Sequence, residues 1–140
     1  MIMKRSIAIF VCFLFTSALL YGQDLTGKWE LQSVELKKVD ELGKETAEDF
    51  QKGMFNEQHS GIFEVLTFNA NKCTTNINGE STTEMYELSG GMLFLYFSAT
   101  PFQYNTQQNG QELTLQTTFV INDKDFVPIE YRTTCIYKKQ

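Results

Sequence analysis

Tight reversals recur through this chain, and they limit it to antiparallel β-structure. Asn78-Gly79 and Asn109-Gly110 predict two-residue hairpin turns, and Ser89-Gly90-Gly91 predicts a third reversal. The reversals separate short runs in which apolar and polar residues alternate, as expected of strands. Strands joined by tight turns must be antiparallel. The expected strands span residues 27–38, 63–68, 73–77, 82–88, 92–97, 102–107, 112–120 and 129–138.

A meander of about eight strands would leave two exposed edges, which invite aggregation. Closure into an up-and-down barrel removes both edges, and eight strands enclose a space that either fills with side chains or holds one small ligand. The alternative is a sandwich of two sheets, but a sandwich needs longer crossover connections. The sequence therefore favours an all-β fold, an eight-stranded antiparallel up-and-down barrel.

The connection after the first expected strand is the long one. Within residues 39–60, Phe50, Met54 and Phe55 recur at helical spacing behind an approximate capping box. This pattern predicts a short helix or an ordered loop between the first two strands. We expect it to cover one end of the sheet.

The N-terminus has the three-part form of a secretory signal peptide. Lys4 and Arg5 precede an apolar run over residues 6–20, and small or polar residues follow it. We expect residues 1–23 to be the signal peptide and residues 24–140 to be a single domain. The apolar run is short for a membrane span, although an uncleaved N-terminal anchor is the alternative. We therefore expect an exported protein without a stable membrane span after cleavage.

Charge and scattered polar residues argue against several classes of function. The chain has a formal net charge of −5, which includes Lys4 and Arg5, so the mature part is more acidic and unsuited to nucleic acid or anionic lipid. His59 is the only histidine in the sequence and has no paired nucleophile or carboxylate in a recognisable pattern. The carboxylates are scattered, and Asn122–Asp125 lacks the glycine and glutamate of a calcium loop. We expect no catalysis, no metal and no cofactor.

Two cysteines, Cys73 and Cys135, lie in the mature part of the chain. In an exported protein such a pair forms a disulfide or stays as two separately buried thiols, and the sequence leaves both alternatives open. The expected strand order does not place the two residues on neighbouring strands.

The first expected strand opens with Gly27-Lys28-Trp29, which contains the only tryptophan in the sequence. This opening resembles the G-x-W motif of the lipocalins, and the signal peptide, the long first connection and the following hairpins are similar to the plan of the short bacterial lipocalin-like domains of the calycin type. The resemblance implies that Gly27 and Trp29 form a structural plug at one end of the barrel. It also implies that the guanidinium of Arg132, in the last expected strand, packs over the indole ring. A bacterial protein of this kind is periplasmic or secreted.

Residues 92–97 are apolar on both faces, so at least one face must pack against something other than water. The resemblance implies a non-catalytic protein that binds a small hydrophobic molecule inside the barrel. The alternative is a filled barrel that serves as an envelope protein-interaction or structural module, with a protein partner or as a homodimer. The expected cavity-lining residues are Ser33, Phe50, Met54, Phe68, Tyr86, Leu95, Thr117 and Tyr131.

Overall fold

A computed structural model describes residues 24–52, 54, 60–96 and 101–140. The predicted signal peptide, His59 and Phe55 lie outside the described residues. Within the described ranges the chain forms nine strands. They are β1 (Gly27–Val39), β2 (Glu45–Glu48), β3 (Val65–Asn69), β4 (Lys72–Ile77), β5 (Glu80–Ser89), β6 (Met92–Leu95), β7 (Phe102–Asn109), β8 (Glu112–Asn122) and β9 (Pro128–Lys139). No helix in the described ranges is long and apolar enough to cross a membrane.

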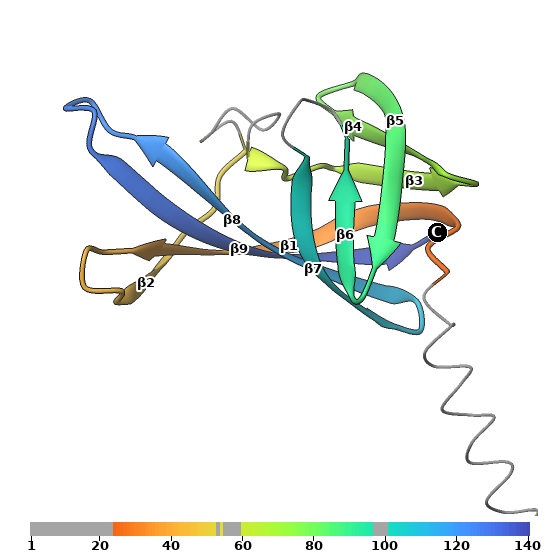
Figure 1. Ribbon diagram of the computed structural model, residues 1–140, viewed down its shortest axis with the longest axis horizontal. Coiled ribbons are helices and arrows are strands. Elements are labelled where there is room, and N and C mark those ends of the chain that lie inside the picture. The colour runs from red at the N-terminus through yellow and green to blue at the C-terminus, as the bar shows by residue number, and fades with distance from the viewer. Residues whose placement is uncertain (1–23, 53, 55–59, 97–100) are drawn as a thin grey trace, which may run out of the picture.

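β1 and the strands β3 to β9 form a closed antiparallel barrel (Figure 1). Consecutive strands pair from β3 to β9, and β9 returns to pair with β1. The predicted eight-stranded up-and-down barrel is therefore confirmed. The turn chemistry explains the meander, since Asn78 and Gly79 both have positive φ, 52° and 80°.

The first connection contains β2, which sequence analysis did not predict. Residues 36–39 of β1 pair with β2 after a turn in which Gly43 has a φ of 80°. Residues 45–48, in the first part of the expected helix or loop, therefore form a strand. Phe50 is half-buried against the core, whereas Met54 is 42% exposed.

Four strand segments extend beyond the barrel as one sheet, which we call the arm. β1 pairs with β3 only through residues 27–30, so the second half of β1 leaves the barrel. The arm consists of residues 36–39 of β1, β2, residues 117–122 of β8 and residues 128–133 of β9. The β1–β2 and β8–β9 turns lie at the same end of the molecule, opposite the barrel (Figure 1, left).

The barrel interior is packed with large side chains. Those that are almost fully buried are Trp29, Leu66, Phe68, Cys73, Leu93, Leu95, Tyr104, Leu113, Leu115, Cys135 and Tyr137. The Tyr104 hydroxyl donates to the carbonyl of Gly61 (2.7 Å), and the Tyr137 hydroxyl donates to that of Phe63 (2.8 Å). These bonds hold the buried segment of residues 61–63 against the core. Gly61 has a φ of 71°, and a Cβ there would lie 2.5 Å from the Tyr104 hydroxyl, so only glycine fits.

Trp29 is fully buried, and its indole nitrogen donates to the carbonyl of Leu25 (2.8 Å). The cation near its ring is Lys139, whose Nζ lies 5.7 Å from the ring centroid. The expected contact with Arg132 is wrong. The register of β1 against β9 places Trp29 opposite Lys139 and places Arg132 opposite Lys37, in the arm.

Cys73 and Cys135 are both buried and both free, so the disulfide is not formed. Their strands are not neighbours, because β4 pairs with β3 and β5 while β9 pairs with β8 and β1. Burial raises the pKa of each thiol to about 12. Both side chains therefore act as small apolar parts of the core.

Candidate functional site

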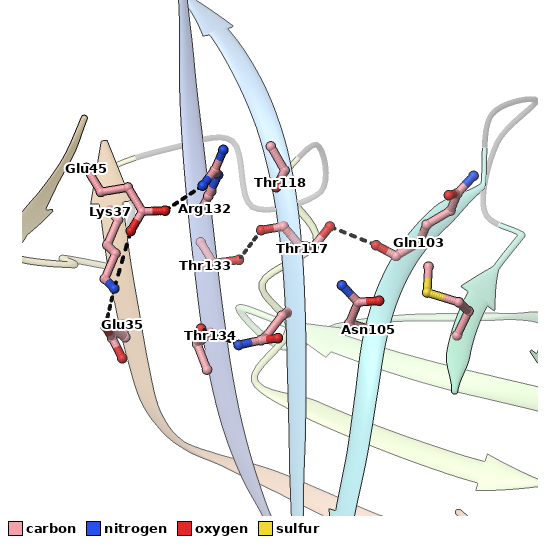
Figure 2. A pocket seen from close by; sticks show the side chains of 12 residues that line it. Glu35, Lys37, Glu45, Gln103, Asn105, Thr117, Thr118, Arg132, Thr133 and Thr134 are labelled. Carbon is pink, nitrogen blue, oxygen red and sulfur yellow. Dashed lines mark hydrogen bonds and ion pairs between the residues drawn. The ribbon is translucent and has the colours of Figure 1, made fainter. Parts of the chain in front are cut away.

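The candidate site is a groove on the outside of the barrel, where β8 separates from β7. The pairing of these strands ends at Asn105 opposite Gln116, whereas β8 continues beside β9 up to Asn122. The groove has a volume of about 520 Å³ (Figure 2). It is lined by Glu35, Lys37, Glu45, Met92, Gln103, Asn105, Gln116, Thr117, Thr118, Arg132, Thr133 and Thr134.

One hydrogen bond crosses the point where the strands separate. The Thr117 hydroxyl of β8 donates to the Gln103 carbonyl of β7 at 2.8 Å (Figure 2). Just before it, Asn105 and Gln116 still pair across the two strands. The Thr117 bond therefore ties β8 to β7 where their backbone pairing ends.

Replacing Thr117 with valine should lower the free energy of unfolding by about 1 kcal/mol, because the Gln103 carbonyl loses its donor while the side-chain shape is kept. Urea denaturation would measure this change. Thr118→Val is the matched control, since Thr118 is exposed on the other face of β8, and it should change stability by less than about 0.5 kcal/mol. Equal effects of the two substitutions would show that the Thr117 bond does not hold the strands.

Ion pairs occupy the wall of the groove formed by β1, β2 and β9. Arg132 pairs with Glu45, and Lys37 lies 3.5 Å from Glu45 and 3.4 Å from Glu35 (Figure 2). The hydrogen bond from Arg132 lowers the pKa of Glu45, and the hydrogen bond to Glu35 raises the pKa of Lys37. Each charged group on this wall thus has an opposite charge beside it.

The opposite wall offers neutral hydrogen-bonding groups. Gln103 and Asn105 come from β7, and Gln116 and Thr118 come from β8. Amide side chains donate and accept at once, as a polypeptide backbone does. No group of three or more His, Cys, Asp or Glu residues that could hold a metal occurs in the part of the chain that the structure describes.

Thr117 and Thr118 of β8 line this groove. Residues 117–122 pair with β9, beyond the last residue of β8 that pairs with β7. The segment reads Thr-Thr-Phe-Val-Ile-Asn and carries no charge. β-Branched and aromatic residues favour strand pairing. The composition of residues 117–122 therefore suits a strand.

Two strand edges among the described strands carry glutamates. β2 ends the sheet and contains Glu45 and Glu48. Residues 80–84 of β5 lie beyond its pairing with β6 and contain Glu80 and Glu84. Charged side chains on an edge discourage further strand pairing.

The tip of the β8–β9 hairpin has the same loop hydrogen bonds as the β1–β2 turn. In each, the N–H of the first residue donates to the carbonyl of the fifth, and the N–H of the fourth donates to the carbonyl of the first. Asp40 Oδ1 accepts from the backbone of Leu42 and Lys44, and Asp123 Oδ1 accepts in the same way from the residues two and four positions later. The fourth residue of each loop has positive φ, 80° at Gly43 and 60° at Phe126. A non-glycine residue costs about 1 kcal/mol or more in this conformation.

The residues predicted to line a cavity do not come together in one cavity. Phe68 and Leu95 are fully buried in the packed core. The Tyr86 ring meets Phe68 edge to face at 4.9 Å, and its hydroxyl donates to the carbonyl of Ala70. These three residues are part of the barrel wall and its filling.

The other expected lining residues are dispersed. Ser33 is exposed on the outside, because a register irregularity between Leu31 and Ser33 reverses which side chains of β1 face inward. Thr117 and Tyr131 lie in the arm. Thr117 and Arg132 do line one site together, but that site is the external groove.

The fold and the groove define the class of the protein as a small all-β barrel with a packed core and an external polar groove. Comparison with protein-family models, curated proteins and solved structures found no match.

Proposed function

We propose that this protein is a non-catalytic protein-interaction module, which binds an extended segment of a polypeptide in the external groove. The observation that carries the proposal is the groove of about 520 Å³, whose β7 and β8 side is lined by neutral amide and hydroxyl groups. An extended peptide binds through main-chain hydrogen bonds, and the pockets for its side chains supply specificity.

The packing of the barrel supports an external binding surface. Trp29, Tyr104 and Tyr137 are fully buried, and their polar atoms donate to backbone carbonyls. A side chain that is packed and hydrogen-bonded on all sides cannot move aside for a ligand without a large loss of contacts. The described interior thus favours a filled barrel.

The groove supports a polypeptide as the ligand. The amides of Gln103, Asn105 and Gln116 can bond to the backbone or polar side chains of an extended segment in the groove. The paired charges on the opposite wall favour a segment with few unpaired charges, since an added charge would compete with existing partners. We place this interaction outside the cytoplasm, in the exported, lipocalin-like class that the N-terminal sequence and the G-x-W opening indicate.

Selection of binders from a library of random peptides of about 12 residues would test the proposal. Selected peptides should bind the wild-type protein at least about 10-fold more tightly than the Asn105→Lys variant, because the longer, charged side chain would fill the groove beside its neutral wall. Asn105 is exposed, so this substitution should leave the fold intact. Thr82→Lys, on the exposed edge of β5, is the control and should retain full binding.

NMR chemical-shift mapping with one selected peptide would locate the site. Backbone amide changes concentrated around Gln103, Asn105 and Gln116, which line the groove, would support the proposal. Equal loss of binding in both lysine variants, or shifts confined to the barrel ends, would contradict it.

A small hydrophobic molecule beneath the arm is the second candidate ligand. Phe119 and Tyr131 stack at 5.6 Å between ring centroids, and Phe119 and Phe50 are half-buried against the core. Together they extend the apolar interior from the barrel toward the arm.

Native mass spectrometry with a panel of fatty acids and hydrophobic dyes would test this second candidate. Phe119→Ala should abolish a bound mass that Val120→Ala preserves, because the two residues lie on opposite faces of β8. A ligand-free mass with every compound would exclude it.

A further inference from the structure

A second hollow continues the groove along the outer face of β7 and β8. It has a volume of about 270 Å³ and is lined by Gly91, Asn105, Thr106, Gln107, Thr114 and Gln116. Asn105 and Gln116 line both hollows, and they face each other in the register of β7 against β8. The groove and the second hollow therefore meet at this pair and form one continuous surface.

The side chains that β7 and β8 contribute to this surface are neutral and polar. They alternate with inward-facing residues, because successive side chains of a strand point to opposite faces. The outward set, which we call the amide track, consists of Gln103, Asn105 and Gln107 of β7 and Thr114, Gln116 and Thr118 of β8. β7 and residues 113–122 of β8 contain no charged residue. The amide track thus offers hydrogen-bond donors and acceptors but carries no charge of its own.

The spacing of the amide track matches that of an extended polypeptide. Gln103, Asn105 and Gln107 are alternate residues of one strand, and such residues repeat every 7 Å or so, at about 3.4 Å per residue. An extended segment that lies over the seam between β7 and β8 repeats its own inward side chains at the same interval. Three alternate ligand residues therefore meet three successive positions of the track, so the contact covers about five ligand residues.

The chemistry of the amide track selects among ligand side chains. A charged side chain would lose water beside neutral groups that cannot neutralise it. An apolar side chain would cover the amides of Asn105 and Gln116 and leave them without hydrogen-bond partners. Hydroxyl and amide side chains avoid both costs, since they donate and accept as the track does.

We infer that the groove recognises an extended segment in which every second residue is serine, threonine, asparagine or glutamine, over about five residues. This inference rests on the proposed peptide binding and names the class of peptide. The intervening ligand residues face away from the track, so the track does not select them. The ligand extends past the groove into the second hollow.

Variants of the second hollow test whether the ligand extends along the whole track. Gln107 lines the second hollow but not the groove, and it is exposed. Gln107→Lys should therefore weaken a selected peptide at least about 5-fold without unfolding the barrel. Asn109→Lys is the matched control, because Asn109 is the next exposed alternate residue of β7 and lines neither hollow. Isothermal titration calorimetry would measure both affinities.

Substitutions in one selected peptide test the predicted pattern. The selected peptides should share a stretch with serine, threonine, asparagine or glutamine at its first, third and fifth positions. At the third position, alanine should weaken binding at least about 5-fold and lysine at least about 10-fold. Alanine at the second or fourth position should change the affinity less than about 2-fold, because these side chains face away from the track.

The outcomes separate this inference from the proposed function. Peptides that lose affinity in Asn105→Lys but bind Gln107→Lys as tightly as the wild type would overturn the inference alone. Selected peptides without a polar, uncharged residue at every second position would do the same. A protein for which no peptide can be selected would overturn both proposals. Equal losses in Gln107→Lys and Asn109→Lys would place the ligand outside the amide track and also overturn the inference.

Discussion

Replacing Trp29 with alanine is expected to lower the free energy of unfolding by about 3 to 5 kcal/mol. The indole is fully buried and packs within the core that fills the barrel. Its removal leaves a cavity that the closed sheet can collapse around only in part, and it leaves the carbonyl of Leu25 without its donor. Urea denaturation monitored by far-UV circular dichroism would measure the change, because the only tryptophan fluorophore is lost.

Two milder substitutions separate the contributions of the indole. Trp29→Phe keeps much of the apolar volume but removes the bond to Leu25, so it should cost clearly less than alanine. Lys139→Ala removes the cation near the ring, a contact worth about 0.5 to 1 kcal/mol at an exposed site. Near-native stability of Trp29→Ala would show that the tryptophan does not plug the barrel.

The barrel could be predicted because its determinants are local. Asn78-Gly79 and Gly90-Gly91 adopt positive φ at both positions, which is the property that makes such pairs hairpin turns. Each tight turn makes two consecutive strands antiparallel neighbours. A meander of such strands has two exposed edges, and closing the sheet into a barrel removes both. The expected strand bounds differ from the observed ones mainly at their ends.

Side-chain orientation could not be predicted where it depends on pairing between distant strands. The irregularity between Leu31 and Ser33 arises where β1 pairs with β9, and it turns Ser33 outward. The same pairing decides that Lys139, and not Arg132, lies near Trp29. The local sequence around Ser33 and Arg132 does not determine the register between β1 and β9.

The groove and the arm were missed for a related reason, although the sequence held a signal. β8 and β9 have 11 and 12 residues, whereas β6 and β7 have 4 and 8. Part of β8 must therefore extend past the end of β7. Unequal strand lengths in a meander indicate where a barrel wall opens.

The protein is also expected to unfold at alkaline pH, because its core holds protonated acids. Burial raises the pKa of the Cys73 and Cys135 thiols from 9.0 to about 12, and it raises the pKa of Tyr104 and Tyr137 well above 10.0. Below pH 9 the thiols are protonated in both the folded and the unfolded chain, so they do not alter stability. Above pH 9 only the unfolded chain releases these protons, and stability falls as the pH rises toward 12.

The size of this loss is comparable with the stability of a small domain. Each thiol lowers the free energy of unfolding by about 1.4 kcal/mol per pH unit between its two pKa values. Two thiols together would remove about 8 kcal/mol over three units, against a typical total of about 5 to 15 kcal/mol. The tyrosines add to the loss above pH 10. We therefore expect unfolding between about pH 10 and pH 12.

Urea denaturation at pH 8, 9 and 10 would measure the slope before unfolding becomes complete. The matched control is the double variant Cys73→Ala, Cys135→Ala, which is less stable at every pH because two small cavities form, but which lacks the buried thiols. Its free energy of unfolding should fall much less between pH 9 and pH 10 than that of the wild type. Since the slope and not the absolute stability carries the information, equal slopes for the two proteins would show that the thiols are not held protonated by burial in the core.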